Sequence, residues 1–307
     1  MQNKNQKIYI AGHNGMAGSA IQRALIKNGY NNIITVPRRL VDLRNECQLE
    51  EYIKNNKPDV VIMCAAKVGG INANITQPVA FLLDNLKIQN NIISLSAKYN
   101  VNNFIFLASS CIYPRNCDQP MRIESLFKGE LEPTNEGYAL AKIAGIKLLE
   151  AYRKEYNFKS LTVIPCNLYG QGDSFDVNNS HVLSALVKKF VDAKNKNSNE
   201  VVLWGTGIAK REFLHVDDFA SALLILLNNQ HTETINIGSG VEISIKDLAN
   251  KIAKIINFKG VIKWDNSKPD GMLNKLMDNR QIKGVGFTPK ITLEEGIKQM
   301  ITEYKRG

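Results

Sequence analysis

Apolar and polar residues along the first half of the chain form a pattern that predicts strands and helices in turn. A short apolar run at 7–11 is followed by a glycine-rich stretch and then by 19–28, where apolar side chains recur at helical spacing. Further strands are expected at 33–36, 60–65, 104–108 and 161–164, with helices at 49–55, 79–99 and 138–156. Strands that alternate with helices predict right-handed crossovers, and therefore an α/β fold with a doubly wound parallel sheet covered on both faces.

The alternation breaks after Tyr169, where a loop at 170–180 follows. Later segments with a helical or strand pattern lie at 181–193, 201–203, 217–227, 233–237 and 245–256, with a turn at 204–207. Some of them are expected to return to the sheet and others to build a smaller lobe. We predict a nucleotide-binding domain at 1–169 with returning segments from about 212–240, and a substrate lobe at 170–211 and 241–307.

Composition is typical of a soluble globular protein, since 44% of the 307 residues are hydrophobic and 22% are charged. No apolar run approaches the ~20 residues of a membrane-spanning helix. The first residues do not resemble a signal peptide, so a cytoplasmic location is expected. The five cysteines (Cys47, Cys64, Cys111, Cys117 and Cys166) and the four histidines lack the spacing of a disulfide framework or a metal site, so no metal is expected.

The net charge of +10 comes mainly from dispersed lysines rather than from one basic stripe. Nucleic acid is therefore not the expected partner. A positive field of this kind favours a small anionic ligand.

Gly12, Gly15 and Gly18 follow the first expected strand and open the first expected helix. Glycines at this spacing allow a tight turn and a close approach to a pyrophosphate, which the free amides at the helix N-terminus attract. The pattern predicts a Rossmann-type dinucleotide site, in which Asn14 and Met16 of the same loop also contact the cofactor.

Arg38 and Arg39 lie just beyond the second expected strand, and no acidic residue occurs there before Asp42. An acid at this point receives the ribose 2′-hydroxyl of NAD, whereas arginine accommodates the 2′-phosphate of NADP. The sequence therefore favours NADP, although two solvated surface arginines would give the same pattern. Either arginine is a candidate for the phosphate contact.

Tyr138 and Lys142 are one helical turn apart, and Ser109 directly follows the strand expected at 104–108. The carboxyl ends of parallel strands face the ligand crevice, so Ser109 and Tyr138 can both reach one carbonyl oxygen. We expect the Lys142 ammonium to lower the pKa of the Tyr138 phenol and to bind the nicotinamide ribose. The three side chains predict a ketone-reducing site.

These motifs resemble those of the extended short-chain dehydrogenase/reductases, most of which act on nucleotide sugars. Within that family the chain is similar to enzymes that epimerise GDP-4-keto-6-deoxy-mannose at C3 and C5 and then reduce C4 with NADPH. The resemblance covers nearly the whole chain and rests on residues 11–20, 65–71, 109–114, 138–145, 167–170, 180–182, 211–218 and 268–271.

The resemblance implies further roles. Cys111 and His181 match the acid/base pair that exchanges protons at C3 and C5, and Asn167 is placed near the nicotinamide or the sugar. Lys189 and Lys275 match contacts to the diphosphate or the sugar. The family is usually homodimeric, through two long helices that correspond here to 79–99 and 138–156.

Two other residues suit the GDP part of such a substrate by their own chemistry. Trp204 can stack on guanine or ribose, and Arg211 offers a planar guanidinium to the diphosphate. A buried structural tryptophan and solvated lysines are the alternative interpretations of these positions.

Several residues depart from the family pattern. Gly137 stands where proline is usual, Cys166 replaces threonine, Ser184 replaces proline, and Asn14 replaces an arginine that contacts the 2′-phosphate. An enzyme that only reduces C4 of a related GDP-4-keto-6-deoxy-heptose therefore stays open. A non-catalytic sensor of NADP or nucleotide sugar is a further alternative, but it would not need the proton-transfer groups.

Overall fold

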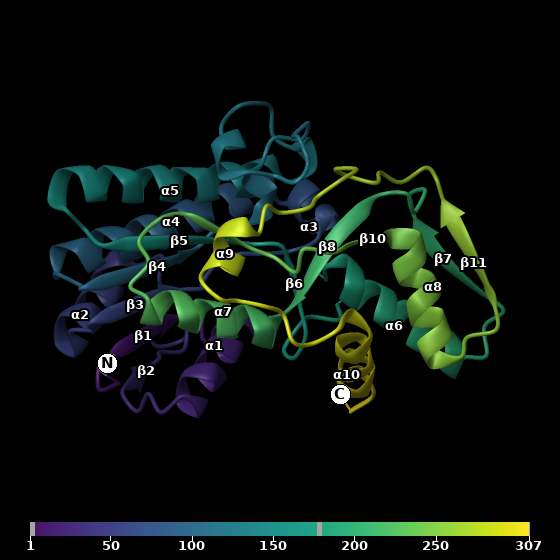
Figure 1. The fold of residues 1–307 in the computed structure, drawn as a ribbon, viewed down its shortest axis with the longest axis horizontal. Coiled ribbons are helices and arrows are strands. Elements are labelled where there is room, and N and C mark those ends of the chain that lie inside the picture. The colour runs from purple at the N-terminus through teal and green to yellow at the C-terminus, as the bar shows by residue number, and fades with distance from the viewer. Residues whose placement is uncertain (1–3, 177–179, 307) are drawn as a thin grey trace.

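A six-stranded parallel sheet forms the centre of the larger part of the molecule (Figure 1). The computed structural model describes residues 4–176 and 180–306. The strand order is β2-β1-β3-β4-β5-β9. The chain places β2 on one side of β1 and β3 on the other, and this change of side predicts a ligand crevice at the carboxyl end of β1. The expected fold class is confirmed. The strands are β1 (Ile8–Ala11), β2 (Ile33–Ile34), β3 (Val60–Met63), β4 (Asn103–Leu107), β5 (Ser160–Pro165) and β9 (Ile235–Ile237).

Helices cover both faces of this sheet. One layer holds α2 (Glu46–Asn56), α4 (Pro78–Lys98) and α5 (Glu136–Tyr156), and the other holds α1 (Met16–Lys27) and α7 (Val216–Asn228). The buried Gln89 of α4 donates to the Ala141 carbonyl oxygen of α5 at 2.6 Å, and Arg23 of α1 pairs with Asp217 of α7 at 2.8 Å. These polar contacts add to the apolar packing within each layer.

Element limits differ from the expected ones mainly at turns. The strand expected at 33–36 is regular only over Ile33–Ile34, because the chain turns at Pro37, whose carbonyl oxygen accepts from the amides of Leu40 and Val41. The helix expected at 49–55 already begins at Glu46, where the Asn45 side chain accepts from the Gln48 amide. Of the expected loop at 170–180, residues 177–179 lie outside the described residues.

The second part of the molecule has its own apolar core, separate from that of the large sheet. Two small sheets and three helices enclose it. The sheets contain β6 (Asn167–Tyr169), β8 (Lys210–His215) and β10 (Glu242–Ser244) in one, and β7 (Glu200–Trp204) and β11 (Val261–Asp265) in the other. The helices are α6 (Val182–Asn195), α8 (Ile245–Ile256) and α10 (Leu293–Arg306).

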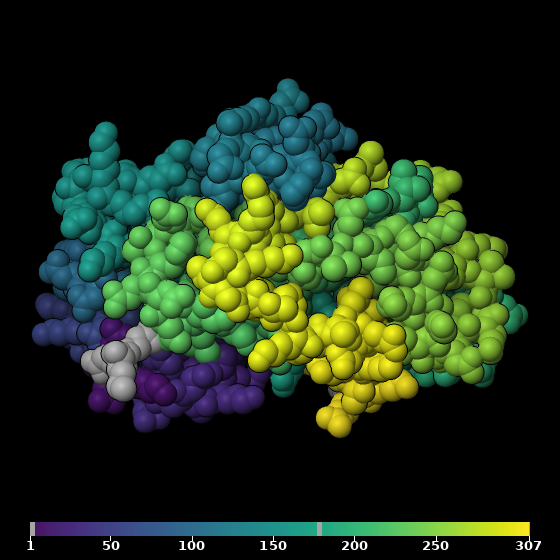
Figure 2. All heavy atoms as spheres, in the orientation of Figure 1, coloured from purple at the N-terminus to yellow at the C-terminus, as the bar shows by residue number. Residues whose placement is uncertain are grey.

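The chain after β11 crosses from the second part back to the large sheet. It runs to α9 (Arg280–Gly284) and then returns to α10, so that it lies along one face over both parts (Figures 1 and 2). The buried Glu212 carboxylate holds this segment, since it accepts from the Met277 amide at 2.8 Å and from Asn279 Nδ2 at 3.0 Å. The crossing segment therefore joins the two parts of the molecule.

The shorter helical elements connect these parts. They are α3 (Ile71–Thr76) and the 3-10 turns η1 (Ser110–Ile112), η2 (Ile123–Ser125) and η3 (Pro133–Asn135). Within residues 4–176 and 180–306, no helix is long and apolar enough to span a bilayer. The same residues contain no group of three or more His, Cys, Asp or Glu side chains arranged to hold a metal ion.

Candidate active site

A cavity of about 980 Å³ lies between the two parts, at the carboxyl ends of β1, β3 and β4. Residues from both parts line it. With the exception of Arg39, the side chains expected to act in binding or catalysis meet here. They are Gly12, Asn14, Gly15, Met16, Gly18, Arg38, Ser109, Cys111, Tyr138, Lys142, Asn167, His181, Lys189, Trp204, Arg211 and Lys275.

The glycine loop is shaped for close approach of a ligand. Gly12 has a φ of +91°, and a Cβ there would lie 2.6 Å from the Ala65 backbone nitrogen, so only glycine fits. A Cβ on Gly18 would lie 2.2 Å from the Gly12 carbonyl oxygen. No side chain caps the N-terminus of α1, and its first turn carries no acid, so its amides are free for a pyrophosphate.

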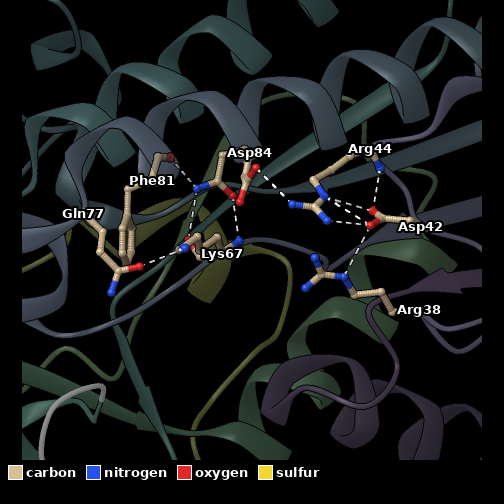
Figure 3. A network of polar contacts seen from close by, with 8 residues as sticks. Arg38, Asp42, Arg44, Lys67, Gln77, Phe81 and Asp84 are labelled. Carbon is tan, nitrogen blue, oxygen red and sulfur yellow. Dashed lines mark hydrogen bonds and ion pairs between the residues drawn. The ribbon is translucent and has the colours of Figure 1, made fainter.

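The end of the cavity near Arg38 and Asp42 holds a network of charged side chains (Figure 3). Arg38 lies 3.6 Å from Asp42, while Arg44 pairs with Asp42 at 2.6 Å and with Asp84 at 3.2 Å. A hydrogen bond from Arg44 holds the pKa of Asp42 down at about 2. Arg39 is exposed and does not line the cavity, so Arg38 is the better placed of the two predicted arginines.

The other side of the same network fixes the loop after β3. Asn85 of α4 accepts from the Lys67 amide at 2.8 Å and donates to the Lys67 carbonyl oxygen at 3.0 Å, and Lys67 Nζ donates to Gln77 at 3.0 Å (Figure 3). These bonds hold the wall of the cavity that faces the glycine loop.

Ser109 and Tyr138 meet at the end of β4. The turn η1 begins here, with the Ser109 hydroxyl oxygen accepting from the Cys111 amide at 3.5 Å. Ser109 also forms a hydrogen bond with the Tyr138 phenol. The hydroxyl and the phenol therefore face the same point in the cavity.

Lys142 lies near Ser109 and Tyr138 and is almost completely buried, with 2% of its surface exposed. Its Nζ donates to the Leu107 carbonyl oxygen at 2.8 Å and lies 5.8 Å from the centre of the Tyr138 ring. Burial lowers the pKa of Lys142 to about 8.

The expectation that Lys142 lowers the pKa of Tyr138 is wrong for this structure. Burial and the neighbouring Cys111 raise the pKa of the phenol, and only the hydrogen bond with Ser109 acts in the other direction. The loss of hydration outweighs the nearby cation, because the Lys142 ammonium is directed to a backbone carbonyl. The Tyr138 phenol is therefore neutral and has a proton to donate.

Cys111 and His181 approach the cavity from different segments. Cys111 lies in η1, where burial raises the pKa of its thiol while Lys275, Ser109 and Lys142 act to lower it. His181 is exposed at the N-terminus of α6, and the side chain of Asp173 lies close enough for the imidazole to affect the pKa of its carboxyl. Burial is the larger influence and raises the pKa of Asp173.

Trp204 closes the far end of the cavity and is half exposed. Lys189 and Lys268 lie over its ring at 5.9 and 5.6 Å, and Lys189 also donates to the Val202 carbonyl oxygen at 3.0 Å. A half-exposed indole with two cations near its ring suits a ligand that carries both an aromatic base and negative charge.

Arg211 faces the same region from β8. Its guanidinium donates to the carbonyl oxygens of Met272 at 2.5 Å and Asp270 at 3.1 Å. The Asp270 carboxylate accepts from the amide and hydroxyl of Thr206 at 2.8 and 2.7 Å, which fastens the turn after β7 to the crossing segment. These bonds aim Arg211 while leaving other N–H groups for a ligand.

One departure from the family pattern has a local explanation. A Cβ on Gly137 would lie 3.3 Å from the Pro78 carbonyl oxygen, so glycine suits the close contact between the starts of α4 and α5. Cys166 is buried, and nothing in the structure explains its presence in place of threonine. The neighbouring Asn167 donates from Nδ2 to the Glu212 carbonyl oxygen at 2.8 Å.

Sequence reasoning missed four acidic or basic side chains that line or adjoin the cavity. Arg44 and Asp84 belong to the charged network near Arg38, Asp173 adjoins His181, and the buried Glu132 belongs to the wall. Only Arg44, two residues after Asp42, had a signal in the sequence, since it continues the basic stretch that begins at Arg38.

The fold and the site define a nucleotide-binding enzyme of the extended α/β type, and comparison with known proteins agrees. Residues 8–238 match the model of the NAD dependent epimerase/dehydratase family, and the chain belongs to that family. It is 46% identical over 305 residues to a putative GDP-L-fucose synthase 2 of Arabidopsis thaliana, covering 99% of this chain and 93% of the relative. The resemblance inferred from the motifs is thereby confirmed.

Two further proteins are similar to this chain over nearly its whole length. GDP-L-fucose synthase of Escherichia coli K12 is 43% identical over 302 residues, covering 95% of this chain and 94% of the relative. A solved GDP-mannoheptose C4 reductase of Campylobacter jejuni with NADP bound is 33% identical, with a TM-score of 0.88 and 100% of each chain covered.

Proposed function

We propose that this protein converts a GDP-4-keto-6-deoxy sugar by epimerisation at C3 and C5 and NADPH-dependent reduction at C4. The product from GDP-4-keto-6-deoxy-mannose is GDP-L-fucose. One observation carries the proposal: Ser109, Tyr138 and Lys142 share a single cavity with Cys111 and His181, and that cavity extends from the glycine loop to Trp204.

The residues that line the cavity are suited to bind NADP. The narrow loop at Gly12 and Gly18 and the free amides of α1 suit the pyrophosphate, and Arg38 suits the 2′-phosphate. Lys142 and Asn167, which line the same cavity, would contact the nicotinamide half of the cofactor. When bound there, the reduced cofactor supplies the hydride for C4.

Epimerisation needs a base on one face of the sugar and an acid on the other. The C4 ketone acidifies the protons on C3 and C5, so Cys111 and His181, approaching from η1 and α6, can remove a proton and return one from the opposite side. Ser109 and Tyr138 hold the oxygen on which negative charge develops.

Reduction uses the same oxygen. The neutral Tyr138 phenol gives its proton to the C4 oxygen, and the hydrogen bond from Ser109 and the nearby Lys142 stabilise the phenolate that results. Because the partly buried phenol stays protonated, it is a donor rather than a base in this step.

The two parts of the molecule bind different ligands. The large-sheet part, to which α7, β9 and α9 return, holds the cofactor, and the second part holds the nucleotide sugar. The expected bounds of 1–169 and about 212–240 differ from this division, because β6 and the start of the returning segment, in β8, pair in the small sheet. Trp204 stacks on the guanine or ribose, while Arg211 and Lys189 contact the diphosphate. The exposed indole and the unshared N–H groups of Arg211 support this assignment.

Product analysis tests the proposal. The protein is incubated with GDP-4-keto-6-deoxy-mannose in deuterated water, with and without NADPH. Deuterium should enter C3 and C5 without cofactor, and GDP-L-fucose should form when NADPH is present. No NADPH oxidation and no exchange would leave only a binding role.

A second candidate is reduction alone, on a GDP-4-keto-6-deoxy-heptose. The similarity to the Campylobacter jejuni reductase over 100% of both chains favours it. Reduction of the heptose without deuterium at C3 and C5 would support this candidate and exclude the epimerase role.

We also propose that the protein forms a homodimer through α4 and α5. Val79 and Leu83, which are four residues apart on α4, expose 72% and 45% of their surface, and Leu140 on the adjoining α5 exposes 42%. An apolar face of this kind suits a second copy of the chain. Light scattering of the wild type and Leu83→Asp tests it, with a monomeric wild type contradicting it.

A further inference from the structure

Lys275 reaches the cavity from the crossing segment, which the rest of the chain holds firmly. Both backbone groups of the adjacent Leu276 form hydrogen bonds. Its amide donates to the Gln119 side chain at 2.8 Å, and its carbonyl oxygen accepts from the Met121 amide at 2.7 Å. Met277 is held by Glu212 at 2.8 Å. The backbone that carries Lys275 is therefore fixed against both parts of the molecule.

The Lys275 ammonium has no hydrogen-bond or ion-pair partner in the described part of the chain, although the side chain lines the cavity. It interacts electrostatically with Cys111, Cys166 and Glu132, and Arg211 opposes its charge. Lys275 is partly buried, and a cation that lines a cavity without a protein partner favours a group that becomes negative beside it.

Cys111 is such a group. Its thiol is nearly buried, and burial alone would hold it protonated and make it a poor base. Among the groups that favour its thiolate, Lys275 has the largest influence, ahead of Ser109 and Lys142. Lys142 is less available, because its Nζ is bound to the Leu107 carbonyl oxygen.

We propose that the Lys275 ammonium stabilises the thiolate of Cys111 and so makes Cys111 the base for proton exchange at the sugar. In that step the carbon–hydrogen bond breaks, an S–H bond forms, and the electron pair moves into the enolate that faces Ser109 and Tyr138. Cys111 then releases its proton to water in the cavity. This inference rests on the proposed function and goes beyond a contact between Lys275 and substrate.

Alkylation of Cys111 without any substrate tests the pairing. The tryptic peptide 99–115 contains Cys111 as its only cysteine, so mass spectrometry isolates its reaction with iodoacetamide. The rate is followed from about pH 6 to about pH 10 in wild type, Lys275→Met, Lys275→Gln and Lys275→Arg. Lys283→Met, which removes an exposed lysine outside the cavity, is the matched control.

Removing the charge should move the midpoint of the alkylation profile upward by roughly 1 to 3 pH units, and Lys275→Arg should restore most of the difference. The control should behave as wild type. Unchanged midpoints in folded Lys275→Met and Lys275→Gln would overturn the inference. NADPH binding reports folding of each variant.

Deuterium exchange then links the pairing to the reaction. At neutral pH and saturating substrate, Lys275→Met should exchange at C3 and C5 about 10- to 100-fold more slowly than wild type and recover as the pH rises. A residue that only binds substrate would change KM and leave the alkylation profile alone. Absence of exchange in the wild type would remove the proposed epimerase function, whereas the alkylation profile tests the Lys275–Cys111 pair independently.

Discussion

Lys142 Nζ donates to the carbonyl oxygen of Leu107 at 2.8 Å, which ties the catalytic helix α5 to the last residue of β4. The bond keeps the ammonium near the end of β4, 5.8 Å from the centre of the Tyr138 ring. It also explains how a lysine that is 2% exposed is tolerated, because the charge keeps one strong acceptor.

Replacing Tyr138 by phenylalanine should reduce C4 reduction about 100- to 10,000-fold, because the proton donor is lost. NADPH oxidation with the 4-keto sugar measures the change, and NADPH affinity should be nearly unaffected. Tyr156→Phe, at the other end of α5 and 64% exposed, is the control and should turn over normally. Full activity of the Tyr138 variant would contradict the assigned role.

Lys142 should make stability depend on pH in a defined direction. Its pKa falls from 10.5 in the unfolded chain to about 8 in the folded state, so the native protein binds fewer protons between these values. The burial penalty is fully present below about pH 8 and is relieved as the pH rises toward 10.5.

The variant Lys142→Met should therefore be inactive but more stable at pH 7, by up to about 3 kcal/mol before the lost hydrogen bond is counted. Its advantage should shrink above pH 8. Urea unfolding at several pH values measures the difference between the two proteins. A gap that widens with rising pH would show that the sign is wrong.

Gly12→Ala should destabilise the protein by roughly 2 to 4 kcal/mol and weaken NADPH binding. The added methyl group would lie 2.6 Å from the Ala65 backbone nitrogen at a φ of +91°. Gly284→Ala is a sharp control, because a Cβ there meets nothing within 4 Å. Thermal unfolding and NADPH titration measure both effects, and equal behaviour of the two variants would refute the steric argument.

Arg38→Ala should raise KM for NADPH about 10-fold or more and leave KM for NADH little changed, since only NADPH carries the 2′-phosphate. Arg39→Ala should alter neither value much, because Arg39 does not line the cavity. The ratio of kcat/KM for the two cofactors measures the preference. Should Arg39→Ala produce the larger loss, the phosphate site lies elsewhere.

Much of the site could be predicted from the sequence because its residues stand at fixed offsets from local elements. Gly12 follows β1, Ser109 follows β4, and Tyr138 and Lys142 share one helical turn, so periodicity alone places them. The strands of the second part were harder to predict. β6 and β10 have three residues each and pair with β8 from distant segments, so their own periodicity is too short to detect.

The chain's local pattern by itself determined the parallel α/β architecture and the residue types that do the chemistry, since both follow from spacing within one element or its adjoining turn. Tertiary structure alone decided that Arg44 and Asp84 form an ion pair and that Lys275 and Cys111 line one cavity. It also decided that Tyr138 is held neutral, since burial depends on segments far apart in the chain. Desolvation and charge act through space, and no pattern along the sequence measures them.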